Sequence, residues 1–215
     1  MKSLFIGILL IIILGVGGLV YRNAVEYPTK PVACPMDAMI CPNGTSISRT
    51  GLSCTFSPCQ LPNVSFSNIG IAFAIPSGFS SVPLPDTASF AAYEMPVGPS
   101  TNGLVANIIV RRYVISASTT ALETIQKTAI GGASGIPVGA TAFSSTVLGS
   151  HRFTVVSIER FEGVIDTAYY LARNADILRF DAIDRGTDWT NPNLDLSTLP
   201  AHSALVRMLN TLQGQ

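Results

Sequence analysis

The sequence predicts an α+β fold: a transmembrane helix at the amino terminus, a small disulfide-rich module, and then an antiparallel sheet, a meander, with a mid-chain helix and a carboxy-terminal helix packed on it. Three observations predict it. An uncharged apolar run near the start precedes four cysteines in residues 34–59, and strand-like runs joined by tight turns follow before an amphipathic helix. Helices segregated around an antiparallel sheet define this class.

The apolar run Leu4–Val20 predicts a membrane signal anchor. It contains no charge, and at 1.5 Å per residue a helix of this length spans about 26 Å, the short end of what crosses a bilayer core. Tyr21-Arg22 is a plausible interfacial anchor. Two alternatives stay open: cleavage as a signal peptide near Gly15-Val16-Gly17, and lipid attachment at Cys34, whose preceding residues faintly resemble a bacterial lipobox.

The cysteines indicate the side of the membrane on which the chain lies. Four cysteines so close together would be unusual as free thiols, and they fit an oxidising compartment. We therefore expect a single-pass protein of the cell membrane with an extracytoplasmic domain. Its parts are a signal anchor at residues 4–21, a tether at 22–33, a four-cysteine module at 34–60 and the α+β domain at 61–215.

The overall composition limits the partners. Net charge is zero, 12% of residues are charged and 47% are hydrophobic. Without a basic surplus to neutralise phosphates, nucleic acid is not expected to bind. The expected partners are the membrane, through the N-terminal helix, and a protein of the cell envelope.

The four-cysteine module predicts two disulfides. Cys34, Cys41, Cys54 and Cys59 are separated by turn-forming residues, and so short a segment cannot bury enough apolar surface to hold itself together without cross-links. Three connectivities are open; we favour Cys34–Cys54 with Cys41–Cys59, which closes two overlapping loops. Zinc is the alternative, although only Cys54 and Cys59 approach the spacing of a zinc knuckle.

This module resembles a short cysteine module of predicted exported proteins in uncultured bacterial lineages. The shared features are the Cys41-Pro42-Asn43-Gly44-Thr45 turn, Arg49 before Gly51, and the closing Cys54–Cys59 segment with Phe56 inside it. The resemblance implies a bacterial envelope protein and carries no known activity.

The first half of the main domain shows three strand-like runs and one helix. The runs are Val64–Ile75, Ala88–Glu94 and Leu104–Tyr113. Thr120 and Glu123 form a capping box that starts the helix. A flexible loop is expected from Gly131 to Gly139.

The second half shows four strand-like runs joined by tight turns, the pattern of an antiparallel meander. A long loop then leads to a helix opened by Pro200, a residue favoured at the first helical position. Its apolar residues share one face for docking on the sheet. The runs are Phe143–Leu148, Arg152–Phe161, Val164–Ala172 and Asp176–Ala182, and the helix face is Ala201, Leu205, Met208, Leu209 and Leu212.

The two ends of the domain carry a second resemblance. The Ile75-Pro76-Ser77-Gly78-Phe79 turn after the opening strand, the meander, and the closing Met208-Leu209-Asn210-Thr211-Leu212 helix resemble the PsbP-like family of extracytoplasmic domains. Bacterial members often show a YPxGW-like turn, and here Ile75 and Phe79 replace its aromatic pair. The resemblance implies a mostly non-enzymatic assembly or accessory domain.

Catalytic residues are not evident in the sequence. His151 lies eight positions from Glu159 on the same strand face, too far for this carboxylate to orient it as a general base. His202 lies near the start of a helix, where the dipole disfavours its charged form. Ser134 lacks the glycine two positions later that a nucleophile elbow needs, because Ile136 stands there. We expect both histidines to be surface or partly buried structural residues.

Two groups of residues are the candidates for binding. The arginines Arg111, Arg112, Arg152 and Arg160 alternate along strands and would form a modest basic patch on the sheet. Arg152 and Arg160, with His151, are the residues we expect to bind an anionic ligand. The Asp181–Asp195 loop is rich in oxygen ligands, but it lacks the EF-hand spacing for calcium. We expect it to fold over the domain with Trp189 as a buried plug, and we expect no metal and no cofactor.

These observations together favour a membrane-anchored cell-envelope binding or accessory module of unknown ligand, without enzymatic activity. Two alternatives remain: an envelope hydrolase that uses His151 or the Asp181–Asp195 loop, and a structural subunit of a surface assembly.

Overall fold

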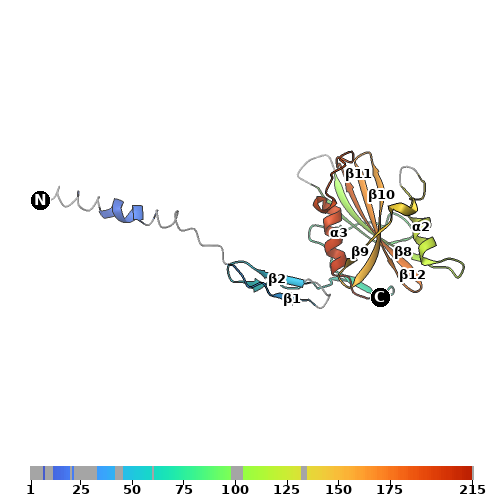
Figure 1. The fold of residues 1–215 in the computed structure, drawn as a ribbon, viewed down its shortest axis with the longest axis horizontal. Helices are drawn as coiled ribbons and strands as arrows, with labels where there is room; N and C mark the ends of the chain where they lie inside the picture. The colour runs from blue at the N-terminus through green and yellow to red at the C-terminus, as the bar shows by residue number, and fades with distance from the viewer. Residues whose placement is uncertain are drawn as a thin grey trace. The chain divides into compact units, whose positions relative to one another are not determined.

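The computed structural model describes residues 7, 12–19, 21, 33–41, 46–59, 61–97, 104–131 and 135–214. The chain divides into two units, residues 1–39 with 47–57 and residues 40–46 with 58–215. Figure 1 shows the elements in chain order, with the sheet and its helices in the second unit.

The predicted fold class is wrong in its transmembrane helix. Residues 7, 12–19 and 21 are helical. No helix within the described ranges is long and apolar enough to cross a membrane. Residues 4–6, 8–11 and 20 of the predicted anchor, and residues 22–32 of the predicted tether, lie outside the described residues. The structure is instead that of a sheet-rich chain with short helices and two disulfides.

The cysteine segment forms a small three-stranded sheet in the order β1 (Ala38–Ile40), β2 (Ser46–Thr50), β3 (Thr55–Phe56). Its disulfides join Cys34 to Cys54 and Cys41 to Cys59. The prediction of interleaved disulfides is confirmed, and all four cysteines are used.

Arg49 organises the part of this sheet that belongs to the first unit. Its Nε donates to both carboxylate oxygens of Asp37 at 2.8 and 3.0 Å, and one terminal nitrogen donates to the Cys54 carbonyl at 3.0 Å. The guanidinium also lies 4.2 Å from the centre of the Phe56 ring. Arg49 therefore ties the chain before Cys41 to the turn that holds Cys54.

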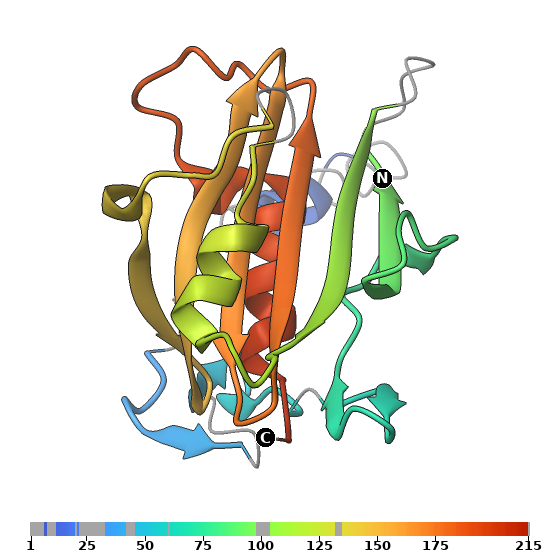
Figure 2. The same ribbon diagram turned by 90° about the vertical axis from the view of Figure 1, so that its right-hand side faces the viewer.

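The second unit is built on a seven-stranded antiparallel sheet, which Figure 2 shows with one helix on each face. The last four strands are the predicted meander, and β12 extends to Arg185. The strand order is β6 (Ser80–Ser81), β7 (Ser89–Pro96), β8 (Val105–Val114), β12 (Asp176–Arg185), β11 (Val164–Ala172), β10 (His151–Phe161), β9 (Ser144–Leu148).

The predicted opening strand is two strands in the structure. β4 (Val64–Phe66) and β5 (Ile71–Phe73) pair with each other across a tight turn in which Ile69 and Gly70 both donate to the Phe66 carbonyl. Gly70 has φ +74°, a conformation that costs glycine little and other residues more. Residues 64–75 therefore make a hairpin where the apolar pattern predicts one continuous strand.

The two helices cover opposite faces of the sheet (Figure 2). α3 (Pro200–Asn210) packs on the larger core with Phe153 and Phe180, and its predicted apolar face is buried. α2 (Ala121–Thr128) covers a smaller core with Tyr170 and Ile177. The predicted capping box at Thr120 is present. Short 3₁₀ turns, η1 (Ala140–Ala142) and η2 (Leu196–Thr198), complete the described elements.

The amino terminus of α3 is capped by Asp184 of β12. Its carboxylate accepts the Ala201 and His202 amides at 2.7 and 3.1 Å. A carboxylate at this position accepts hydrogen bonds from amides that have no partner within the helix. Its negative charge also interacts favourably with the positive end of the helix dipole. This contact fixes the position of α3 against the sheet.

Candidate ligand-binding site

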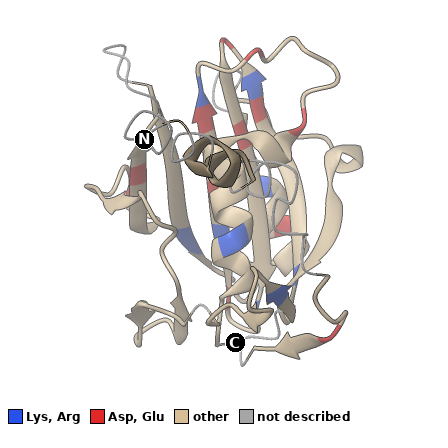
Figure 3. Ribbon diagram, turned by 90° about the vertical axis from the view of Figure 1, so that its left-hand side faces the viewer, with Lys and Arg blue, Asp and Glu red and all other residues tan. Residues whose placement is uncertain are grey.

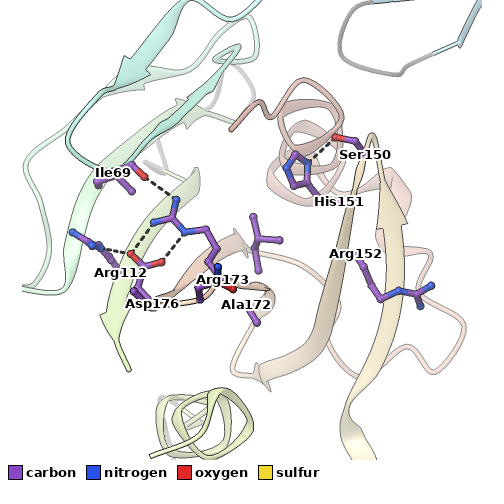
Figure 4. A pocket seen from close by; sticks show the side chains of 11 residues that line it. Ile69, Arg112, Ser150, His151, Arg152, Ala172, Arg173 and Asp176 are labelled. Atoms are coloured by element: carbon purple, nitrogen blue, oxygen red, sulfur yellow. Dashed lines mark hydrogen bonds and ion pairs between the residues drawn. The ribbon is translucent and has the colours of Figure 1, made fainter. Parts of the chain in front are cut away.

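A cavity of about 570 Å³ lies at one end of the seven-stranded sheet. Because the strands are antiparallel, this end collects the start of β10 and β12 together with the finish of β8 and β11. The cavity walls combine cationic, apolar and turn residues: Ile69, Arg112, Ser150, His151, Arg152, Leu171, Ala172, Arg173, Asn174, Ala175 and Asp176 (Figure 4).

Asp176 is the buried centre of the polar wall, with 3% of its side chain exposed. Arg173 binds it with two nitrogens, Nε at 2.6 Å and a terminal nitrogen at 2.7 Å, and Arg112 Nε donates to it at 2.5 Å. The remaining terminal nitrogen of Arg173 donates to the Ile69 carbonyl at 2.7 Å. Through these bonds Arg173 holds the β11–β12 turn and the β4–β5 turn in place.

The two arginines keep Asp176 ionised. Burial by itself would raise the pKa of this carboxyl, but the hydrogen bonds from Arg173 and Arg112 outweigh it and hold the pKa below its ordinary value. The three side chains therefore carry two positive charges and one negative charge, a surplus of one cation at the cavity wall.

Arg112 carries the open part of that surplus. Its side chain is 38% exposed, against 12% for Arg173. Its Nε is fixed by Asp176, whereas within the described part of the chain its two terminal nitrogens have no hydrogen-bond partner. A guanidinium offers two edges for bidentate binding. In Arg112 the edge formed by the terminal nitrogens is left for a ligand.

His151 lines the same cavity but is occupied on both ring nitrogens. Nε2 lies 2.9 Å from the Gly214 carbonyl and Nδ1 lies 3.2 Å from Ser150 Oγ. Since a carbonyl only accepts, Nε2 carries a proton here. His151 therefore fastens the carboxy-terminal segment, which also pairs with β5 through Gln213 and Ala72. It contacts a carbonyl where a general base would need a carboxylate.

The structure places the two predicted arginines of β10 apart. Arg152 contributes to the cavity rim, but its side chain extends away from the Arg173–Asp176 pair (Figure 4). Strand alternation explains this, since Arg152 and its neighbour His151 point to opposite faces. Arg160 is eight residues along the strand, about 26 Å away, where its guanidinium donates to the Trp189 and Asn191 carbonyls.

The sequence predicts Arg112 only as one of four arginines in a basic patch, and it does not bring Arg112 together with Arg173 and Asp176. The only signal in the sequence is local: Arg173 and Asp176 flank the turn between two strand-like runs. Arg112 comes from a strand more than sixty positions earlier, and it reaches Asp176 only because β8 pairs with β12.

A second arginine–aspartate cluster lies on the opposite face of the sheet, beneath α2. Asp181 is fully buried and accepts from Arg179 Nε at 2.6 Å and from a terminal nitrogen of Arg111. Arg111 Nε also binds Asp86 at 2.8 Å, and Arg179 donates to the Thr128 carbonyl of α2 at 2.6 Å. These contacts join β8, β12 and the end of α2.

Asp166 is the carboxylate of this second cluster that is least closely paired with a cation. Its nearest cation, Arg179, is 3.9 Å away and more tightly bound to Asp181. Burial, followed by the nearby charge of Asp181, raises the pKa of Asp166 well above its ordinary value. One of its oxygens has no hydrogen-bond partner within the described residues. Arg179 is therefore paired mainly with Asp181 and only loosely with Asp166.

The aspartate oxygens of the Asp181–Asp195 loop accept hydrogen bonds from neighbouring parts of the chain. Asp184 caps α3, Asp188 accepts from Thr190, and Asp195 accepts from the Ser197 amide. In the described part of the chain no group of three His, Cys, Asp or Glu residues could hold a metal ion. Trp189 packs 5.3 Å from the Phe161 ring and is half-buried, so the predicted buried plug is only partly formed.

Charge over the second unit is mixed. Figure 3 shows basic and acidic segments interspersed along the strands. His202, the other histidine, lies 2.8 Å from the Tyr169 hydroxyl, and burial lowers the pKa of its ring. It sits in the α3 core, away from the cavity at the sheet end.

No protein-family model and no curated protein matches this sequence. The resemblances to PsbP-like domains and to exported cysteine modules stay predictions.

Proposed function

We propose that the protein is an extracytoplasmic, non-enzymatic binding module of the cell envelope whose ligand occupies the cavity beside Arg112. Two disulfides support the location, because such bonds persist in oxidising compartments. The cavity supports binding, because its volume of about 570 Å³ lies in the range of small-molecule sites.

The observation that carries the proposal is the state of Arg112. Asp176, itself held by Arg173, binds Nε of Arg112. The terminal nitrogens of Arg112, a residue of the cavity lining, have no hydrogen-bond partner within the described residues. A cation fixed in advance loses little conformational freedom when a ligand arrives. His151 supports binding over hydrolysis, because both of its ring nitrogens are already engaged.

The test is a fragment screen on the full chain, with anionic, neutral and cationic small molecules. Binding is measured as a rise in melting temperature and as amide chemical-shift changes for residues 150–152 and 173–176, which line the cavity. We expect at least one charge class to shift these amides, and to stop doing so in Arg112→Gln. If no class shifts them, the cavity is not a binding site and the proposal is wrong.

A further inference from the structure

We infer that the ligand of this cavity is a monoanionic carboxylate with an apolar body, an inference that rests on the proposed function. Three independent features of the cavity select this class: the size of its charge surplus, the shape of its open cationic edge, and the room beside that edge.

The charge surplus selects a single negative charge. Arg112 and Arg173 face one carboxylate, Asp176, so the inner wall is left with one positive charge. The lining holds one further arginine, Arg152, and its side chain points away (Figure 4). A carboxylate neutralises the surplus, whereas a phosphate dianion would leave excess negative charge beside buried Asp176.

The open edge selects a planar, forked anion. The terminal nitrogens of a guanidinium form two parallel hydrogen bonds with the two oxygens of a carboxylate. Asp176 holds Arg112 through Nε, and the same planar group leaves its terminal edge correctly oriented for such a partner. A lysine at this position would supply the charge but not the fork.

The room beside the edge selects an organic anion over an inorganic one. A cavity of about 570 Å³ is far larger than an inorganic ion needs. Ile69 and Leu171, exposed by 8% and 7%, form the apolar part of the wall together with the small side chain of Ala175. An alkyl group packed against them would remove apolar surface from water, which favours binding.

The experiment compares three probes on the full chain: hexanoate, its neutral counterpart hexanamide, and inorganic phosphate. Dissociation constants come from titration of the cavity amides. We expect hexanoate to bind at least tenfold more tightly than hexanamide, and phosphate to leave the cavity amides unshifted.

The variants locate the effect. Arg112→Gln is expected to weaken hexanoate binding at least tenfold, and Arg112→Lys to recover only part of the loss. The matched control is Arg160→Gln, which removes an arginine of the same strand that lies outside the cavity lining and donates to the Trp189 and Asn191 carbonyls. It should change the constant less than twofold. Ala175→Trp fills the cavity while keeping Arg112, so it should abolish binding even if Arg112→Gln proves unstable.

The outcomes test the carboxylate inference separately from the proposed function on which it rests. Hexanamide or phosphate binding as tightly as hexanoate at these amides would overturn the carboxylate class and leave the cavity as a binding site. Equal effects of Arg112→Gln and Arg160→Gln would also overturn it. If none of the probes, nor any fragment of the wider screen, shifts the cavity amides, the inference and the proposed function both fail.

Discussion

Two arginine–aspartate clusters lie on opposite faces of one sheet, and their difference shows how the same residue types serve structure or binding. Beneath α2, Arg111 and Arg179 meet three carboxylates, those of Asp86, Asp166 and Asp181. At the sheet end, Arg112 and Arg173 meet only Asp176. The first cluster is closed and rich in acid. The second has a cation with one edge open to a cavity.

Neighbouring residues of β8 make the contrast direct. Arg111 is 15% exposed and divided between Asp86 and Asp181, whereas Arg112 is 38% exposed and bound through one nitrogen. Alternation along the strand sends them to opposite faces. We therefore expect the closed cluster to contribute mainly to stability and the open one to contribute to ligand affinity.

The largest effect is expected from Asp181→Ala. This change leaves Arg111 and Arg179 without their shared, fully buried carboxylate, and breaking a buried ion pair by removing one partner costs about 3–5 kcal/mol. Urea denaturation of the full chain measures the free energy of unfolding. A loss below about 1 kcal/mol, the value of an exposed pair, would mean that this cluster is not structurally important.

A smaller loss is expected from Asp176→Asn at the open cluster. Arg112 and Arg173 keep access to solvent through the cavity, so losing the hydrogen bonds to this charge should cost about 1.5–3 kcal/mol. The same urea titration gives the value. A loss as large as that of Asp181→Ala would show that the two clusters are equally closed.

The neighbouring pair Arg111→Gln and Arg112→Gln separates stability from binding. Arg111→Gln strands buried Asp181 beside Arg179, and we expect it to destabilise by about 2–3 kcal/mol. Arg112→Gln removes a partly exposed cation, for which about 1 kcal/mol or less is expected. Only Arg112→Gln should weaken hexanoate. The comparison fails if both variants lose affinity, or if Arg112→Gln is the less stable one.

The smallest effect concerns pH. Because the pKa of Asp166 is raised in the folded state, its ionisation opposes folding, and this penalty grows as pH rises from about 4 through the raised pKa. Asp166→Asn removes the penalty and should match or exceed the wild-type stability at pH 7. A less stable variant at pH 7 would show that the Asp166 carboxylate supports the fold.

Asp176 should show the opposite dependence on pH. Its pKa is lowered by Arg173 and Arg112, so its contribution is complete above its unfolded value and is lost as pH falls below about 4. In Asp176→Asn this loss at acid pH should disappear, which urea titrations at several pH values below 5 would measure.

Much of the sheet could be predicted from local pattern. Gly149-Ser150 and Glu162-Gly163 punctuate the strand-like runs of β9 to β11, and the capping box at Thr120 marks the start of α2. The opening strand was predicted too long, because its apolar pattern continues through the turn that Gly70 makes. The predicted transmembrane helix is wrong, because no helix among the described residues is long and apolar enough to cross a membrane.

The site was less accessible to sequence reasoning than the strands. His151, Arg152 and Arg112 were named as residues of a basic patch, and all three line the cavity. Arg112 and Asp176 meet because β12 pairs with β8 and with β11 at once, a pairing that no local pattern specifies. The cationic surplus is a property of that meeting, so it appears only in the folded chain.

The central claim is that the terminal nitrogens of Arg112 are a binding edge. A crystal structure of the full chain with hexanoate tests it most directly. We expect the carboxylate to lie within hydrogen-bond distance of both terminal nitrogens of Arg112, with the alkyl chain against Ile69 and Leu171. Hexanoate bound elsewhere, or an Arg112 edge that stays unoccupied while the ligand lies in the cavity, would contradict the account.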